Sequence, residues 1–144
     1  MATTATLTLA SSDIAGDPVS VSKIATLTKA GSLIDLDQST GLSRVHLRSA
    51  TNKVLLAANA EGNNLAAKVY IINKSTDASL YVTVTINAQT VGKLYGGDFL
   101  FIPWSQTDTS ANIEVAATNW TSSTGDIPVE YALFHEDTDF LTNA

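Results

Sequence analysis

Hydrophobic and polar residues alternate along most of this chain with a period of two. The clearest case is Leu80–Asn87, LYVTVTIN, in which aliphatic residues take every second position and Tyr or Thr the positions between. Segments around residues 4–9, 19–27, 43–48, 111–118 and 127–136 repeat the pattern, with Gly, Pro, Asn and Ser between them. Because strand side chains point alternately to two faces, the pattern predicts about nine or ten short strands.

The spacing of these segments, roughly 8–12 residues, is typical of all-β domains with antiparallel strands. The sequence therefore predicts an antiparallel β-sandwich, jelly-roll-like or Greek-key, with little or no helix. Its 144 residues fit a single domain over 1–144. Within it we expect an N-terminal strand or arm over about residues 1–18 and a C-terminal tail over about residues 137–144.

Three segments refine this prediction. Lys68–Asn73 is apolar on both faces, which favours a central strand, and we expect it to form a hairpin with Leu80–Asn87 around a turn at Asn73. Phe99–Trp104 contains Pro103, which cannot donate a ladder hydrogen bond, so this strand should lie at a sheet edge or end there. Asn52–Ala60 suits either a strand or two helical turns, and the strands around it favour a strand.

The predicted core consists of apolar residues on the inward register of the later strands. Truncating Phe101 to Ala should cost about 3–5 kcal/mol if the ring is fully enclosed. The predicted core residues are Val69, Ile71, Val82, Val84, Phe99, Phe101, Val115, Val129, Tyr131 and Leu133.

Composition limits the compartment and the covalent chemistry. The chain has no cysteine, so disulfides and thiolate metal sites are excluded. Its first residues, MATTATLTLASSD, lack the basic and apolar regions of a signal peptide, and no apolar run approaches the roughly 20 residues of a membrane span. The N-x-S and N-x-T sequences at Asn73 and Asn119 are therefore interpreted as turns, not as glycosylation sites.

Charge is distributed unevenly along the chain. The formal net charge is −6; residues up to Lys93 carry eight bases and six acids, whereas the remainder carries eight acids and no base. An acidic second half is a poor partner for phosphate, so we expect neither nucleic acid nor a membrane as partner. The separation of charge instead favours a homo-oligomer, for which a trimer is our first expectation, with bases of one subunit against acids of the next.

Residues that could support catalysis or bind a cofactor are sparse. The two histidines, His46 and His135, have no third ligand in a zinc-site spacing, and the sequence contains no G-x-S-x-G or phosphate-binding glycine motif. His135 is expected as a hydrogen-bonded residue at the rim of the core. Acidic residues around Asp35 and Glu136 suit either solvated loops or a calcium site. We expect no enzyme activity and no cofactor.

Candidate interface residues remain. Arg44 and Arg48 are the only arginines, and alternation places them with His46 on one strand face, either as a solvated surface or as a docking face for carboxylates. Trp104 and Trp120 each fit either a lid on the core or an interface anchor. The predicted interface set is Arg44, His46, Arg48, Trp104, Trp120 and Phe140.

The stretch from Ala66 to Glu136 resembles small structural proteins of tailed-bacteriophage virions. The resemblance lies in a strand that ends in Asn, VYIINKSTDASLYVTV, a strand pair that turns through glycine and ends in Pro, GKLYGGDFLFIPW, and an aromatic last strand, VEYALFHED. It is closest in kind to capsid decoration, or cement, proteins and to the related neck and tail adaptors. About half of the chain is covered.

This resemblance implies a non-enzymatic β-sandwich, made in the host cytoplasm, that binds the major capsid protein or another virion protein and stabilises the outer shell. A neck or tail adaptor is the alternative, as is a receptor-binding module that presents a tryptophan to carbohydrate. A non-viral binding domain or an unrecognised enzyme remains the third class.

Overall fold

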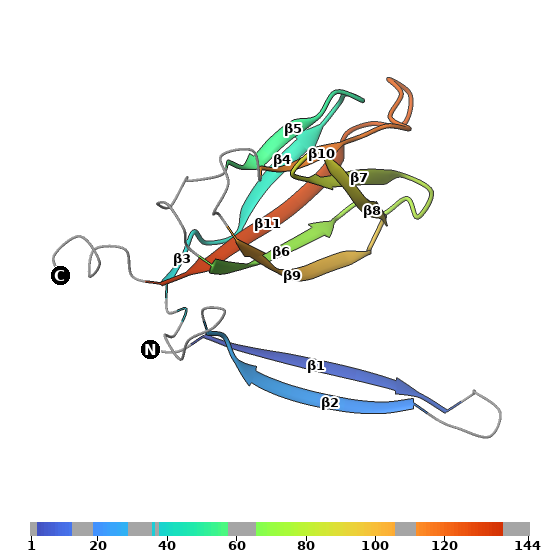
Figure 1. Cartoon of the computed structure of the whole chain (residues 1–144). Coiled ribbons are helices and arrows are strands. Elements are labelled where there is room, and N and C mark those ends of the chain that lie inside the picture. Colours follow the sequence, from blue (N-terminus) through green and yellow to red (C-terminus); the bar gives the residue numbers. More distant parts are fainter. Residues whose placement is uncertain are drawn as a thin grey trace, which may run out of the picture.

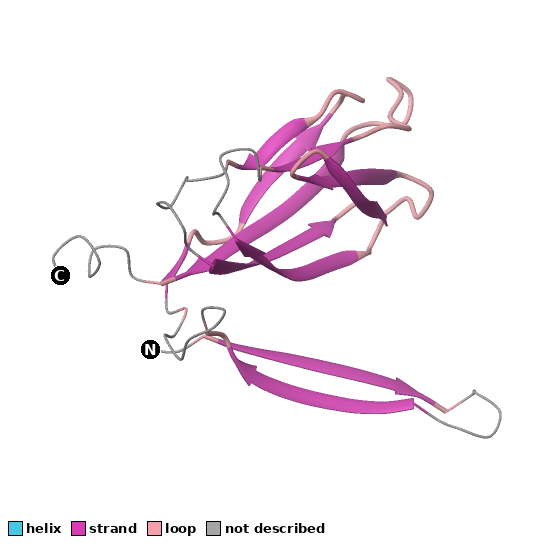
Figure 2. Ribbon diagram, viewed as in Figure 1, coloured by secondary structure: helices cyan, strands magenta, loops and turns pink. Residues whose placement is uncertain are grey.

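The computed structural model describes residues 3–12, 19–28, 36, 38–57, 66–105 and 112–136. All regular secondary structure in this part of the chain is β-strand (Figure 2). The strands are β1 Thr4–Ser11, β2 Val19–Thr26, β3 Gln38–Ser39, β4 Ser43–Leu47, β5 Lys53–Leu56, β6 Ala66–Asn73, β7 Tyr81–Ile86, β8 Gln89–Tyr95, β9 Phe99–Ser105, β10 Ile113–Ala116 and β11 Ile127–His135.

Two antiparallel sheets form the body of the protein (Figure 1). One has the order β5-β10-β7-β8; in the other, β9, β6 and β11 follow one another, and both β3 and β4 pair with β11. The predicted antiparallel sandwich is therefore confirmed. Lys53–Leu56 is a strand, as favoured, and β9 with Pro103 lies at a sheet edge.

The chain crosses between the two sheets at almost every connection. Within the body, β7 and β8 are consecutive strands that pair with each other. Every connection from β4 to β7 and from β8 to β11 runs from one sheet to the other. The resulting orders, β4-β11-β6-β9 and β5-β10-β7-β8, are those of an eight-stranded jelly roll.

The core lies between the two sheets. Seven predicted core residues have 0–1% of their surface exposed, because both sheets turn the same register of aliphatic side chains inward. Tyr131 is only partly buried and packs against this core. The seven are Val69, Ile71, Val82, Val84, Val115, Val129 and Leu133.

The prediction that Phe99 and Phe101 belong to the core is wrong. Phe99 is 59% exposed and Phe101 is 39% exposed. Opposite residues of paired strands point to the same face, and the buried β6 residues Val69 and Ile71 face Ile102 and Leu100. The inward register of β9 is therefore Leu100, Ile102 and Trp104, and both phenylalanines lie on the outer face.

The expected hairpin around Asn73 is also wrong. β6 and β7 lie in different sheets, so the segment after Asn73 is a corner that carries the chain across the sandwich. The Asn73 side chain is fully buried there: Nδ2 donates to the carbonyls of Leu80 (3.1 Å) and Leu94 (2.9 Å), and Oδ1 accepts from the Ser75 amide (2.9 Å). Both the nitrogen and the oxygen of this side-chain amide are therefore hydrogen-bonded to backbone groups.

Further contacts tie neighbouring loops to the same end of the sandwich. Asn119 Nδ2 donates to the Ser79 carbonyl (2.9 Å), and Asn119 Oδ1 accepts from the Tyr81 amide (3.1 Å). Gly96 lies so close to the Asp77 loop that a Cβ atom there would stand 2.4 Å from the Asp77 carbonyl oxygen. The side chains of both N-x-S/T asparagines thus form hydrogen bonds with backbone groups of neighbouring segments.

The N-terminal strands form a hairpin that lies apart from the sandwich. β1 and β2 pair with each other in full register from Thr4↔Thr26 to Ser11↔Val19, and with no other described strand. The hairpin lies as a long arm below β6 and β9 in Figure 1. It extends to Thr26, beyond the arm expected over about residues 1–18. At its base the Leu27 amide donates to the Thr3 carbonyl at 2.8 Å.

Candidate functional site

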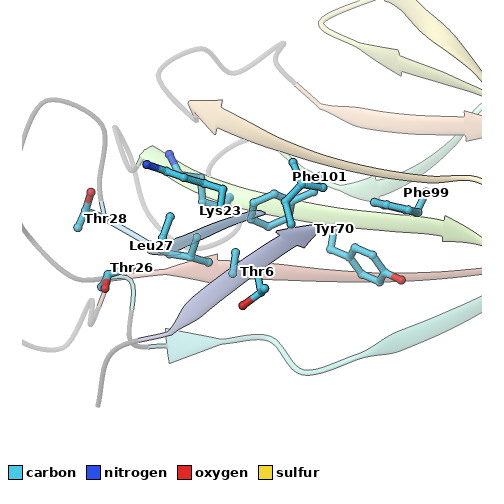
Figure 3. Close-up of a pocket in the computed structure, with 12 residues that line it drawn as sticks. Thr6, Lys23, Thr26, Leu27, Thr28, Tyr70, Phe99 and Phe101 are labelled. Carbon is cyan, nitrogen blue, oxygen red and sulfur yellow. The ribbon is translucent and has the colours of Figure 1, made fainter. Parts of the chain in front are cut away.

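An apolar groove separates the arm from the body. It has a volume of about 610 Å³ and is lined on one side by the arm and on the other by the outer face of β6 and β9 (Figure 3). Its walls carry Ala5, Leu7, Ala25 and Leu27 from the hairpin and its base, and Tyr70, Phe99 and Phe101 from the sheet.

The arm has two chemically different faces. The pairs Ala5↔Ala25, Leu7↔Lys23 and Leu9↔Val21 place mainly apolar side chains on one face, while Thr and Ser dominate the other. Leu7, Leu9 and Val21 remain 44%, 49% and 41% exposed. A two-stranded ribbon with an open apolar face is marginally stable alone in water, so this face is a candidate contact surface.

The opposite wall of the groove is aromatic. Tyr70 and Phe101 are directly opposite each other on β6 and β9, and the Tyr70 and Phe99 ring centroids are 6.4 Å apart with a 40° tilt. This is a favourable tilted contact between rings. The two outward phenylalanines therefore face the apolar side of the arm across the groove.

Two lysines supply the charged side chains among the described residues that line the groove. Lys23 comes from β2 and Lys68 from β6, one from each wall. Figure 3 shows Lys23 and Phe101 among the side chains that line the groove. The groove is therefore apolar with positive charge, which suits a ligand that combines apolar and acidic groups.

The Arg44–His46–Arg48 face lies on β4 and just beyond its end, on the exposed register as predicted. Arg44 forms an ion pair with Glu130, its cross-strand partner on β11. Arg48 forms a two-pronged pair with Asp126, with Nε–Oδ1 and Nη2–Oδ2 distances of 2.7 and 2.8 Å. Both arginines therefore have carboxylate partners within their own chain.

The Arg48–Asp126 pair changes the titration of both groups. The hydrogen bond from Arg48 and its charge lower the pKa of the Asp126 carboxyl, and the same contact raises the pKa of Arg48. The charged forms stabilise each other. A role of this face in docking to another surface stays a prediction, and such a surface would compete with these pairs.

The aromatic interface candidates differ in position. Trp104 is 4% exposed and belongs to the core, so its indole is unavailable at the surface of this chain. Trp120 is partly buried and packs against the core, and its buried Nε1 has no hydrogen-bond partner. Phe140 lies outside the described residues.

The histidines and the acidic residues are the remaining candidates for metal binding. His135 is buried at the core's rim as predicted, with Nδ1 2.8 Å from the Glu136 carbonyl oxygen. In the described ranges, no three His, Asp or Glu residues come together in a way that could hold a metal ion. The calcium alternative involved acids around Asp35 and after Glu136, which fall in undescribed segments. No helix within the described ranges is long and apolar enough to cross a membrane.

Comparisons with known proteins give no relative. No family model, curated protein or solved structure matches this chain.

Proposed function

We propose that this protein is a non-enzymatic structural component of a bacteriophage virion, a capsid decoration protein that binds the outer shell and stabilises it as a homo-oligomer. The observation that carries the proposal is the projecting arm with its half-exposed apolar face. The jelly-roll body supports it as well, because this architecture recurs in viral capsid domains, although that is an analogy of fold. The sequence resemblance over Ala66–Glu136 supplies the phage context.

The physical argument rests on the far part of the arm. Leu9 and Val21 are opposite each other, nearly half exposed, and lie beyond the residues that line the groove. Full burial of such side chains contributes about 1.5–3 kcal/mol each, so covering their exposed halves would contribute about 0.7–1.5 kcal/mol each. The pair therefore contributes roughly tenfold or more to the affinity for a partner surface.

The test uses particles that lack the protein and purified protein added back. We expect Leu9→Ser with Val21→Ser to lower particle affinity by about tenfold or more, since the apolar contact is lost. Thr8→Ala with Ser22→Ala is the matched control, because this pair occupies the other face of the same arm. The control should bind as the wild type does.

The location of bound protein separates the alternatives. Density distributed over the whole shell would support decoration, whereas density confined to one vertex would identify a neck or tail adaptor and refute decoration. Binding that is unchanged by the Leu9 and Val21 substitutions would refute the role given to the arm. The carbohydrate-binding alternative would now depend on Trp120, which is partly buried, because Trp104 is buried.

A further inference from the structure

The groove between arm and body has no occupant among the described residues, although its walls are apolar and partly exposed. Leu7 on the arm and Phe99 and Phe101 on β9 all keep large exposed fractions there. We propose that the residues that follow Glu136, from Asp137 to Leu141, bind in this groove of their own chain. The inference goes beyond the proposed function and holds whatever partner the arm meets.

The first argument is position. β11 ends at His135, and Phe134 near that end lies directly opposite Lys68 on the neighbouring strand β6. Lys68 lines the groove. The chain therefore leaves the sheet one strand away from the groove wall.

The second argument is reach. Five residues span at most about 18 Å when extended, and two residues along a strand advance about 7 Å. Tyr70 is two residues beyond Lys68 on β6, and Phe101 is its cross-strand partner. A segment that turns at Asp137 can thus extend past Lys68 to both rings.

The third argument is that acidic and apolar residues follow one another along the segment in the same order as amines and aromatic rings follow one another along the groove. The sequence after Glu136 is Asp-Thr-Asp-Phe-Leu, acidic first and apolar next. Seen from the end of β11, the groove offers the Lys68 amine first and the Tyr70 and Phe101 rings next. Lys23 on the arm supplies the second cation. Two acids thus match two amines, and two apolar side chains match an aromatic wall.

Such binding would join the arm to the body. At the base of the arm the Leu36 amide donates to the Leu27 carbonyl at 2.9 Å, and both leucines are buried. A peptide between the two walls would contact both and fix the angle of the arm before assembly. This would reduce the ordering cost when the far face, with Leu9 and Val21, meets its partner.

The experiment uses the full chain and a nitroxide label. Because the chain has no cysteine, Thr142→Cys provides a single attachment site. We expect the label to broaden the backbone amide NMR signals of Leu7, Lys23, Tyr70 and Phe101 strongly at low salt. A label at Thr51→Cys, in the exposed loop between β4 and β5, is the control and should leave these signals sharp.

Substitutions in the segment test the chemistry. Asp137→Asn with Asp139→Asn should remove most of the broadening, and so should Phe140→Ser with Leu141→Ser; Thr138→Ser is the matched control and should keep it. About 0.5 M salt should weaken the effect in the wild-type segment, because part of the contact is ionic.

Two outcomes would overturn the proposal. One is an absence of broadening at the groove in the labelled full chain. The other is broadening that appears only when unlabelled ¹⁵N protein is mixed with nitroxide-labelled ¹⁴N protein, which would identify a second copy as the occupant. Neither outcome depends on particles, so failure here is distinguishable from failure of the decoration role.

Discussion

Replacing Asn73, the last residue of β6, by Ala should destabilise the protein more than the same substitution at any other asparagine in the described part of the chain. Its side chain is fully buried at the corner between β6 and β7 and makes three hydrogen bonds to backbone groups. Two of these reach the carbonyls of Leu80, just before β7, and of Leu94, on the neighbouring strand β8. In addition, the Asn73 backbone amide donates to Asp98 at 3.0 Å.

The magnitude follows from the groups that lose a partner. Asn73→Ala leaves the Leu80 and Leu94 carbonyls and the Ser75 amide without their side-chain partner. Each hydrogen bond contributes about 0.5–1.5 kcal/mol, and a buried group left unsatisfied costs about 1–3 kcal/mol. Allowing for partial access of water, the loss should be about 3–5 kcal/mol. Asn73→Asp should cost at least as much, since it places an acceptor against two carbonyl oxygens.

The assay is urea unfolding, with the slope m used to check that the denatured state is unchanged. Asn119→Ala is the control: that asparagine makes two loop contacts but is only partly buried, so its loss should be about 1–2 kcal/mol. A loss below about 1 kcal/mol for Asn73→Ala, or a larger loss at Asn119, would refute the view that the Asn73 amide holds this end of the sandwich.

Local patterning was sufficient for the fold class and most of the core. Period-two alternation defines which face of β7, β10 and β11 is inward, and both sheets use that register. Alternation leaves open which strand pairs with which. The segment after Asn73 suits a hairpin turn as well as a corner between sheets. It forms a corner because β6 pairs with β9 and β11, whereas β7 pairs with β8 and β10.

The same limit explains the error at β9. Both registers of this strand are apolar, Phe99 with Phe101 on one and Leu100 with Ile102 on the other, so the pattern alone has no polar face to identify. Trp104 was the available signal, because it extends the Leu100 register. The sequence contains the two phenylalanines and the apolar register of β1, but strand pairing decides that the rings point outward, and the position of the arm decides that they meet it across a groove.

The remaining predictions concern the corner, the groove and one surface ion pair. Gly96→Ala should cost about 1–3 kcal/mol in urea unfolding, because its Cβ would meet backbone, whereas Gly92→Ala, which meets nothing within 4 Å, should cost less; equal losses would contradict the close approach. The contacts of Phe101 with the described residues alone, in which 39% of it is exposed, correspond to a cost of about 1–2 kcal/mol for Phe101→Ala in the same assay. With the C-terminal segment bound over the ring we expect a loss of about 3 kcal/mol or more, and a loss of only about 1–2 kcal/mol would show that the groove is open. Asp126→Asn should remove a pH-dependent stabilisation. Arg48 lowers the pKa of the folded Asp126 carboxyl below its ordinary value, so the pair stabilises the fold fully above that ordinary value, about 3.9, and loses its effect as pH falls through the lower folded pKa. The Tm difference between wild type and Asp126→Asn should therefore be constant near neutral pH, shrink below about pH 4, and shrink also with added salt because the pair is exposed. A Tm difference that stays constant into strong acid would mean that Asp126 acts through its shape and neutral hydrogen bonds, and that the charge of the pair contributes nothing.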